Sequence, residues 1–578
     1  MSLDQILALH AAGRMAEAQV LCERLIGEQP GNFEAIHILG VIALQGGDLA
    51  RAVALIGQAI TLCPANADFH SNHGMALAES GQHAAAIAAY DRAIALRPAT
   101  AEIHYNRAAL LQGLERWTDA LAAYDRAIAL EPGFAEAHYN RASILERLGQ
   151  TAAAVAGYDR VLALRPDALD AHCNRGNALQ ALGQLDAAVA AYDRALALQP
   201  GWIEVIYNRG NALTRLGRTD EALACYGHVI TNDPSHLEAR KQVFRHHLIA
   251  VADLPAAEVL SANIFALSAA RDAAALAATK TVPAFRLVHD LEQTDYLIGQ
   301  GHDFPTLREV NACFRDLHGR HVGKIDRAEG SRPVPLSDGD IALIAAFRRQ
   351  LYRPLLSGPI ASCLEPGNDW AAIEERYFAS DPEIIHIDSF LSKPALTALQ
   401  QACLLSTVWT VEYGNRYLGA FADTGFVGPL HYRIASELRQ VMPRIFGGQT
   451  FEQLWAFKYD SQLGGGINLH ADFAKVNLNF WITPDEANLD PETGGMTVYD
   501  VPAPASWDFE TFNSDQAAIR AHLLQSGAGK RTIPYRCNRA VLFNSALFHE
   551  TDVLRFKAGY ANRRINVTYL FGQGLKPH

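Results

Sequence analysis

Residues 137–166 read AHYNRASILERLGQTAAAVAGYDRVLALRP, and closely similar stretches precede and follow them at steps of 34 residues. Within each stretch the apolar residues follow a helical period, in two segments separated by a short turn. The step is kept by three kinds of residue: prolines at 30, 64, 98, 132, 166, 200 and 234, tyrosines at 90, 124, 158, 192 and 226, and glycines at 13, 47, 81, 149, 183 and 217. Glu115 replaces the glycine in one unit. Residues 1–236 are therefore expected to be an array of seven similar helical units.

A 34-residue period with two Ala-rich amphipathic segments and a closing proline resembles the tetratricopeptide repeat, a helix-turn-helix unit. Such a unit cannot bury its apolar face alone, so we expect neighbouring units to stack into an all-α superhelix with a concave groove. The repeated tyrosines fall in the second helix of each unit and are interpreted as packing residues between helices.

An asparagine also recurs every 34 residues, within first-helix segments such as AHCNRGNAL at 171–179. Asparagine is a mediocre helix former, and helix packing does not require it. These segments resemble the repeats of O-GlcNAc transferases, in which an asparagine ladder grips extended polypeptide. The resemblance implies a peptide-binding role for Asn72, Asn106, Asn140, Asn174 and Asn208. The alternative is that these amides satisfy neighbouring backbone groups between repeats.

The composition limits the classes of function. A formal charge of -12 leaves no basic excess to neutralise phosphates, so no nucleic-acid partner is expected. The eight cysteines are scattered without a CxxC pair, which is typical of reduced, buried thiols. No stretch approaches a run of about 18 apolar residues, so we expect no membrane partner and a cytoplasmic protein.

The 34-residue period ends near residue 236. Residues 237–372 begin with helical sequence and continue through Gly- and Pro-punctuated pieces, which favour irregular connections. We expect a helical cap on the array followed by a linking region.

Residues 373–578 have a different sequence pattern: short runs rich in β-branched and aromatic residues are separated by residues that favour turns. A helix is expected over 392–405, with Ser392 at its start. The expected strands include EIIHIDSFL (383–391), LWAFKYD (454–460), GINLHADF (466–473), KVNLNFWIT (475–483), GGMTVYDV (494–501), RTIPYR (531–536), RAVLFNS (539–545) and RRINVTYLFG (563–572). This pattern favours an antiparallel sandwich or barrel.

Two of these runs carry candidate metal ligands. On a strand, His470 and Asp472 would lie on the same face, because side chains alternate. His549 follows an apolar strand and would complete a facial triad of two imidazoles and one carboxylate, a ligand set that suits Fe(II) with open coordination positions. His386 and Asp388 have the same spacing, but they run straight into a helix and are assigned to structure.

The ordered set of His-x-Asp, Gly-Gly turn, distant His and late Arg resembles the 2-oxoglutarate/Fe(II) oxygenase superfamily over residues 375–575. The resemblance implies a double-stranded β-helix (jelly-roll) fold, catalysis at His470, Asp472 and His549, and Fe(II), 2-oxoglutarate and O2 as cofactor and cosubstrates. It also implies a basic residue that binds the distal carboxylate of 2-oxoglutarate. By its place in the motif, that residue is Arg564. Arg563 is the alternative, and only one of the two can point inward, because neighbouring residues on a strand face opposite sides. The further cosubstrate candidates are Asn566, Tyr459 and Asn479.

This sequence departs from the family by an insertion between Gly495 and Pro534, which could cover the active site or be a surface addition. Three functional hypotheses follow. The first is a hydroxylase whose repeats capture a protein or peptide substrate. The second is a small-metabolite oxygenase whose repeats recruit partners, and the third is a non-catalytic repeat adaptor. A glycosyltransferase is disfavoured because alternating βα units are missing from the C-terminal sequence pattern.

Overall fold

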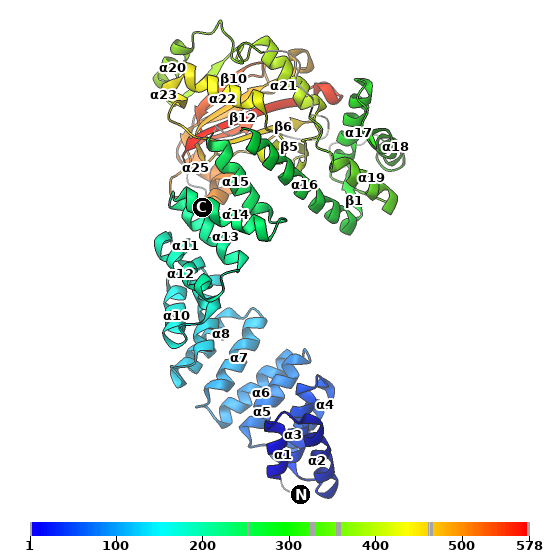
Figure 1. Cartoon of the computed structure of the whole chain (residues 1–578), viewed down its shortest axis with the longest axis vertical. Coiled ribbons are helices and arrows are strands. Elements are labelled where there is room, and N and C mark those ends of the chain that lie inside the picture. The colour runs from blue at the N-terminus through cyan, green and yellow to red at the C-terminus, as the bar shows by residue number, and fades with distance from the viewer. Residues whose placement is uncertain are drawn as a thin grey trace. The chain divides into compact units, whose positions relative to one another are not determined.

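The computed structural model describes residues 3–250, 254–323, 330–353, 360–460, 462 and 466–574. The chain forms two compact units, Met1–Asn232 and Asp233–His578. They are called the repeat unit and the C-terminal unit below, and each is described by itself (Figure 1).

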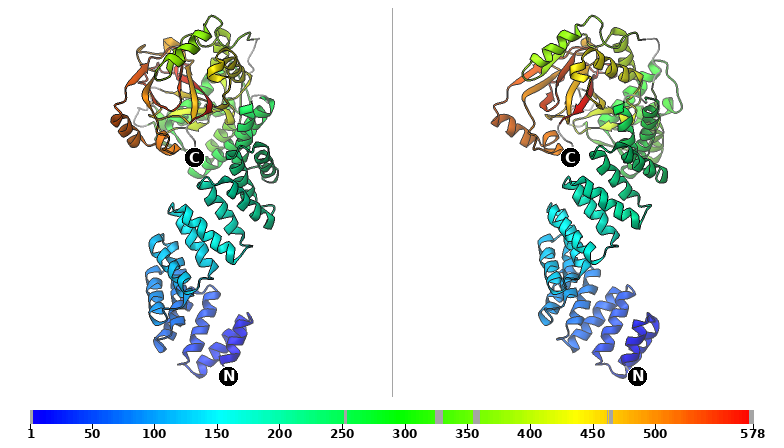
Figure 2. Two further views of the ribbon diagram at one scale, coloured as in Figure 1. Left: turned by 90° about the vertical axis from the view of Figure 1, so that its left-hand side faces the viewer. Right: turned by 60° about the vertical axis from the view of Figure 1, so that its left-hand side comes forward.

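The repeat unit consists, over its described residues, of fourteen helices that form seven antiparallel pairs stacked one on another (Figure 2). It is an all-helical superhelix of repeats, as the 34-residue period predicts. The helices are α1 (Leu3–Ala11), α2 (Met15–Glu28), α3 (Phe33–Gln45), α4 (Leu49–Leu62), α5 (Ala67–Glu79), α6 (His83–Leu96), α7 (Ala101–Gly113), α8 (Trp117–Leu130), α9 (Ala135–Arg147), α10 (Thr151–Leu164), α11 (Leu169–Ala181), α12 (Leu185–Leu198), α13 (Ile203–Arg215) and α14 (Thr219–Asn232).

The repeated tyrosines are packing residues, as predicted. Tyr124, Tyr158 and Tyr192 are completely buried. The ring of Tyr192 lies so close to Gly176 that a Cβ on that glycine would sit 2.5 Å from a ring carbon. The small residues of the first helix in each pair therefore make room for the aromatic rings of the second, and this fit fixes how closely the two helices approach.

The C-terminal unit contains a seven-stranded antiparallel sheet of order β3-β10-β7-β12-β6-β5-β4 and a three-stranded antiparallel sheet of order β11-β8-β9. A two-stranded ribbon, β1 with β2, lies outside both. The strands are β1 (Thr281–Pro283), β2 (Pro333–Pro335), β3 (Ile384–Ile387), β4 (Val411–Glu412), β5 (Tyr417–Phe421), β6 (Phe451–Tyr459), β7 (Ala474–Trp481), β8 (Met496–Pro502), β9 (Lys530–Ile533), β10 (Ala540–Asn544), β11 (Leu547–Thr551) and β12 (Arg564–Gln573).

Some helices of this unit, such as α21 and α22, cover one face of the large sheet, and others pack elsewhere (Figure 1). Their bounds are α15 (Leu237–Ala250), α16 (Leu254–Thr279), α17 (Ala284–Gly299), α18 (Leu307–Leu317), α19 (Asp338–Arg348), α20 (Trp370–Ala379), α21 (Lys393–Leu405), α22 (Pro429–Val441), α23 (Pro443–Phe446), α24 (Phe509–Asn513) and α25 (Gln516–Gln525). A one-turn π-helix, His318–Val322, follows α18. The helix expected from 392 is α21, and the Ser392 side chain caps it by accepting a hydrogen bond from the backbone N–H of Ala395.

Alternation along β7 explains how the core is divided. Leu478 and Phe480 join the apolar layer beneath α21 and α22, whereas Trp481 joins a second layer formed with residues of the small sheet such as Val498. The large sheet is therefore buried on both faces, with helices on one side and the small sheet on the other.

Residues 237–372 belong to the C-terminal unit rather than to the repeat unit. Leu237 and Phe244 of α15 lie in the same apolar layer as the large sheet, and α17 to α19 enclose a smaller core of their own. Within α16, the stretch Ala256–Thr279 is long and apolar enough to cross a membrane by length and composition alone. Ile264 of this helix is completely buried in the protein core.

Two predicted strands differ from the structure. The segment 466–473 forms no regular strand, and only an isolated bridge joins His470 to His549. The strand expected over 531–536 is β9, which ends at Ile533 because Pro534 has no N–H to continue the ladder.

Candidate metal centre

His470, Asp472 and His549 come together between the two sheets. Their ligand atoms all lie within 4.8 Å of one another. Asp472 Oδ1 is 3.8 Å from His470 Nε2, and Asp472 Oδ2 is 3.5 Å from His549 Nε2. The three side chains are at most 12% exposed. In the part of the chain that the structure describes, this is the one cluster of three His, Cys, Asp or Glu residues with metal-binding spacing.

Both histidines are held with the same ring nitrogen facing the other two ligands. His470 Nδ1 lies 2.8 Å from the carbonyl oxygen of Asn468, and His549 Nδ1 lies 3.0 Å from that of Leu547. A carbonyl can only accept, so each Nδ1 carries a proton, and Nε2 is the nitrogen that a neutral imidazole leaves for a cation. This orientation by an outer hydrogen bond is typical of metal-ligating histidine.

The protonation states also suit a cation. Burial lowers the pKa of His470 to about 4, so its imidazole is neutral at pH 7. Burial acts to raise the pKa of Asp472, but the polar groups around its carboxylate, among them the Asn477 amide, outweigh burial and lower that pKa. Asn477 donates from Nδ2 to Asp472 Oδ2 over 2.6 Å. The centre therefore offers the neutral imidazole of His470, a second imidazole in the same orientation and one carboxylate.

The insertion positions the segment that carries His470 and Asp472. Gln516 donates from Nε2 to the carbonyl of Leu469 over 2.7 Å, and the N–H of Ala471 donates to the carbonyl of Phe512 over 3.1 Å. Leu469 and Ala471 pack with Phe512 in one buried cluster. These contacts replace the strand pairing expected for 466–473, and they explain how two ligands two residues apart still converge. The insertion is part of the site's framework rather than a surface addition.

Arg564 begins β12 and is 3% exposed. Its Nε donates to the carbonyl of Gly494 over 2.7 Å and its Nη2 to the carbonyl of Gly495 over 3.1 Å, while its buried Nη1 has no hydrogen-bond partner among the described residues. Gly494 has a φ of +84°, and a Cβ on Gly495 would lie 1.9 Å from the carbonyl oxygen of Ile533. The Gly-Gly turn is therefore needed to bring these two carbonyls to the guanidinium.

The rival residues have other partners. Arg563 lies 2.8 Å from Glu292 and 2.9 Å from Asp460, on the other face of the strand. Asp388 accepts hydrogen bonds from Arg539 and Arg536, so its carboxylate is committed to structural ion pairs.

Arg564, Asn479 and Asn566 line one small cavity with the three candidate ligands. Tyr459 pairs with Arg564 across β6 and β12, and the guanidinium lies 5.0 Å from the centre of its ring. The cavity has a volume of about 20 Å³, room for roughly one water. The buried Nη1 of Arg564 needs an acceptor, so an acidic ligand fits the chemistry of the cavity. A ligand the size of 2-oxoglutarate requires its lining side chains to move.

Asn477, which was not predicted as a site residue, stands two residues from the predicted Asn479 on β7. Asn477 is fully buried and Asn479 is 7% exposed, and both stand at inward positions of an otherwise apolar strand. Polar side chains at alternate positions of a buried strand indicate a functional interior.

A larger cleft of about 510 Å³ opens beside the centre and shares His470 and Asp472 with it. Its walls carry seven aromatic rings and five amide side chains, and among the described residues its only acidic or basic side chains are those of His470 and Asp472. The rings belong to Tyr413, Tyr417, Phe421, Trp455, Phe457, Phe473 and Phe509, and the amides to Asn415, Gln453, Asn468, Asn513 and Gln516. Such a surface can hold neutral groups by ring packing and by hydrogen bonds.

In the repeat unit, the ladder asparagines are half-buried, and four of the five bond to earlier side chains. Asn140 donates to the hydroxyls of Tyr105 and Tyr124, and Asn174 donates to the hydroxyl of Tyr139. Asn72 contacts the ring nitrogen of His37 at 3.0 Å, and Asn208 donates to Asn177. For Asn106 the described residues include no such bond. These partners are side chains. They are not the backbone groups between repeats that were considered as the alternative to peptide binding.

A ladder of ion pairs, which was not predicted from the sequence, also runs along the repeat unit. From Asn106 onward, the residue after each ladder asparagine is an arginine. Its side chain lies 2.5–2.7 Å from an aspartate of the preceding repeat, the residue after the repeated tyrosine. The pairs are Arg107–Asp91, Arg141–Asp125, Arg175–Asp159 and Arg209–Asp193. In the sequence these ion pairs are visible as Tyr-Asp-Arg and Asn-Arg motifs that recur 16 residues apart.

Family models described as tetratricopeptide repeat match residues 3–67, 110–168, 169–201 and 203–236, and one described as TPR repeat matches residues 74–115. The repeat unit is a tetratricopeptide-repeat array. No curated protein matches the chain.

Among solved structures, YrrB, described as a TPR protein with an unusual peptide-binding site, is 22% identical over 32% of this chain and 95% of its own, with a TM-score of 0.30. MamA is 22% identical over 30% of this chain and 94% of its own, with a TM-score of 0.28. PilF of Pseudomonas aeruginosa is 18% identical over 37% and 97%, with a TM-score of 0.32. Likenesses of this size support no inference about function.

Proposed function

We propose that the C-terminal unit is an Fe(II)- and 2-oxoglutarate-dependent oxygenase of jelly-roll type that hydroxylates a polypeptide held by the tetratricopeptide repeats. The observation that carries the proposal is the buried triad of His470, Asp472 and His549, in which both imidazoles turn Nε2 toward the Asp472 carboxylate. Two imidazoles and one carboxylate leave coordination positions open, as oxygenases of this class require.

Each residue around the triad has a role in this proposal. Asn477 fixes the carboxylate of Asp472, and Arg564 offers a buried, unpaired N–H to the far carboxylate of 2-oxoglutarate. Asn479 and Asn566 line the same cavity. When bound, Fe(II) and 2-oxoglutarate supply the oxidising chemistry that places one atom of O2 into a substrate C–H bond and the other into succinate. The protein orients the reactants and keeps bulk water out.

A polypeptide substrate suits the aromatic cleft. Its amides can pair with peptide N–H and C=O groups, and its rings can pack against uncharged side chains. The half-buried ladder asparagines keep amide atoms that their tyrosine partners do not use, so they can bond to a peptide and to the neighbouring repeat together.

A second candidate is a repeat adaptor without catalysis. It is favoured by the small cavity beside Arg564, whose volume of about 20 Å³ does not accommodate 2-oxoglutarate unless side chains move. The two candidates differ in whether the triad supports turnover.

Turnover is tested on the full-length protein with Fe(II), ascorbate and 2-oxoglutarate by measuring succinate. His470→Ala is expected to abolish succinate formation, because one of three ligands is lost. His386→Ala, in the other His-x-Asp pair, is the matched control and should keep it. Succinate formed without iron, or no succinate with any peptide pool, would contradict the oxygenase.

The ladder is tested with Asn140→Ala combined with Asn174→Ala. Peptide binding is expected to weaken, while 2-oxoglutarate decay without substrate continues at the native rate. Equal loss of peptide binding and of 2-oxoglutarate decay would show damage to the fold instead. Mass shifts of +16 in peptides from a treated lysate would identify the hydroxylated residue.

A further inference from the structure

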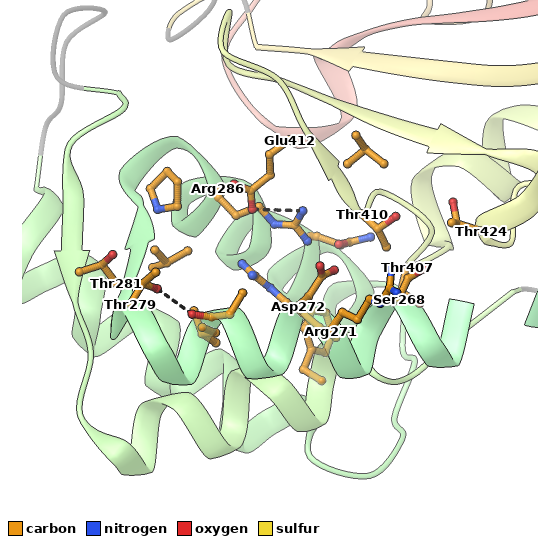
Figure 3. A pocket seen from close by; sticks show the side chains of 18 of the residues that line it. Ser268, Arg271, Asp272, Thr279, Thr281, Arg286, Thr407, Thr410, Glu412 and Thr424 are labelled. Atoms are coloured by element: carbon orange, nitrogen blue, oxygen red, sulfur yellow. Dashed lines mark hydrogen bonds and ion pairs between the residues drawn. The ribbon is translucent and has the colours of Figure 1, made fainter. Parts of the chain in front are cut away.

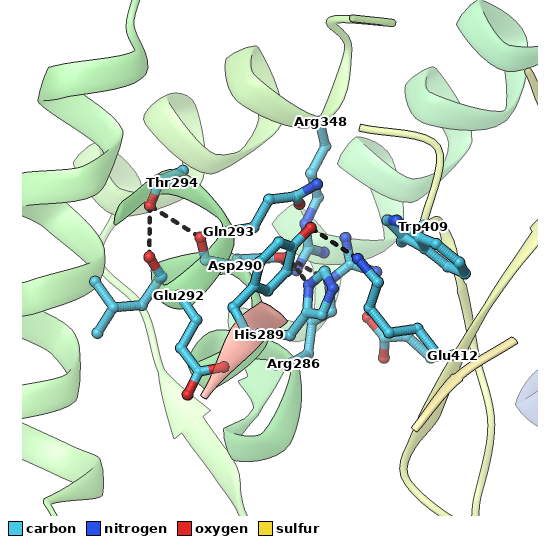
Figure 4. Close-up of polar contacts among 12 residues, drawn as sticks. Arg286, His289, Asp290, Glu292, Gln293, Thr294, Arg348, Trp409 and Glu412 are labelled. Carbon is cyan, nitrogen blue, oxygen red and sulfur yellow. Dashed lines mark hydrogen bonds and ion pairs between the residues drawn. The ribbon is translucent and has the colours of Figure 1, made fainter. Parts of the chain in front are cut away.

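A network of buried charges lies within the C-terminal unit and includes none of the candidate metal ligands (Figure 4). Asp290 of α17 is completely buried and joins two arginines. Its Oδ1 accepts from Arg286 Nε over 2.8 Å, and its Oδ2 accepts from Arg348 Nη2 over 2.9 Å. Burial acts to raise the pKa of Asp290, but the two guanidinium groups hold it well below its ordinary value. The aspartate is therefore charged, and it fixes both guanidinium groups in place.

Both arginines also line a cavity of about 560 Å³ (Figure 3). Arg271 and Asp272 rise into it from α16, and Glu412 of β4 lies 3.8 Å from Arg286 Nη1. The charged lining residues are Lys241, Arg271, Arg286, Arg348, Asp272 and Glu412, and the rest of the wall includes several threonine hydroxyls. A volume of this size is typical of small-molecule sites.

The hydrogen bonds of the arginines are incomplete. Arg348 is 15% exposed, and its Nε is buried without a hydrogen-bond partner within the described ranges. A buried N–H that lacks a partner costs free energy until an acceptor reaches it. Four cationic side chains line the cavity with the carboxylates of Asp272 and Glu412. Asp290 binds Arg286 and Arg348 from behind, so a small cationic excess remains, which an anionic acceptor matches.

We propose that this cavity binds a small anionic metabolite through a phosphate or carboxylate group held by Arg286 and Arg348. Two fixed guanidinium groups match the geometry of such an oxyanion. Arg271 and Lys241 add charge at the rim, and the threonine hydroxyls can bond to the neutral part of the ligand. Glu412 competes with the ligand for Arg286.

The test is calorimetric titration of the metal-free full-length protein with pyrophosphate and, separately, with citrate. Tighter binding of one probe identifies a phosphate or a carboxylate ligand. Arg271→Gln is expected to weaken binding about two- to fivefold, as for one partly exposed charge pair. Glu412→Gln is expected to tighten it by a similar factor, because Arg286 loses its competing carboxylate.

Arg349→Gln is the matched control: Arg349 is the exposed neighbour of Arg348 and does not line the cavity. Arg348→Lys keeps a positive charge beside Asp290 but lacks the Nε–H, so it should bind the probes more weakly. The proposal is overturned if neither probe binds, if Arg349→Gln weakens binding as much as Arg271→Gln, or if Glu412→Gln leaves the affinity unchanged.

Discussion

The repeat unit and the metal centre are built from contacts of very different range. In the repeats the bonded partners lie 16 or 35 residues apart, as in Arg141–Asp125 and Asn140–Tyr105, and similar contacts recur along the array. At the metal centre Gln516 bonds to Leu469, 47 residues away, and Arg564 to Gly494, 70 residues away, and each contact occurs once. Damage in the array should therefore remain local, whereas one lost contact at the centre should change the site.

The largest effect on the metal centre is expected from Phe512→Ala. Phe512 is completely buried, and its carbonyl and ring hold the segment that carries two candidate ligands. Removing a buried aromatic side chain costs about 3–5 kcal/mol. Hydrogen exchange should show residues 466–473 opening, and metal binding should weaken with it.

Phe512→Leu, which keeps most of the volume, should retain metal binding. Tyr158→Ala is the counterpart in the repeat unit, where Tyr158 is also completely buried. It should open its own and adjoining repeats but leave metal affinity unchanged. Similar loss of metal in both variants would contradict the distinction drawn between the two units.

The same contrast determines what could be predicted from the sequence. The helix pairs and the tyrosine packing follow from a 34-residue period that seven prolines and five tyrosines keep. The candidate ligands could be named because His, Asp and His are the residue types that such a centre needs. The support of the 466–473 segment by Phe512 and Gln516 could not be foreseen, since nothing in the sequence links an insertion to a segment some forty residues earlier.

An intermediate effect is expected from Asn477→Ala. Its amide donates to Asp472 Oδ2 over 2.6 Å, and loss of such an outer hydrogen bond typically lowers metal affinity about 10- to 100-fold. Titration with Co(II), followed by its visible absorption, measures the affinity directly. Asn479→Ala is the matched control two residues along the same strand. Asn479 bonds to Thr568 instead, so its loss should change Co(II) affinity little. Equal effects of the two substitutions would remove Asn477 from the ligand framework.

The smallest effect concerns the one turn where the array departs from its own pattern. Glu115 has a φ of +58°, in the left-handed region where the six equivalent positions carry glycine. A side chain costs roughly 1–2 kcal/mol in this region, and glycine costs about 0.5–1 kcal/mol in chain entropy. Glu115→Gly should therefore stabilise the repeat unit by under about 1 kcal/mol. Gly149→Ala, the converse change one repeat later, should destabilise it by a similar amount. Urea unfolding of the two variants measures both, and Co(II) affinity should stay native in each, because the array transmits its contacts only to neighbouring repeats.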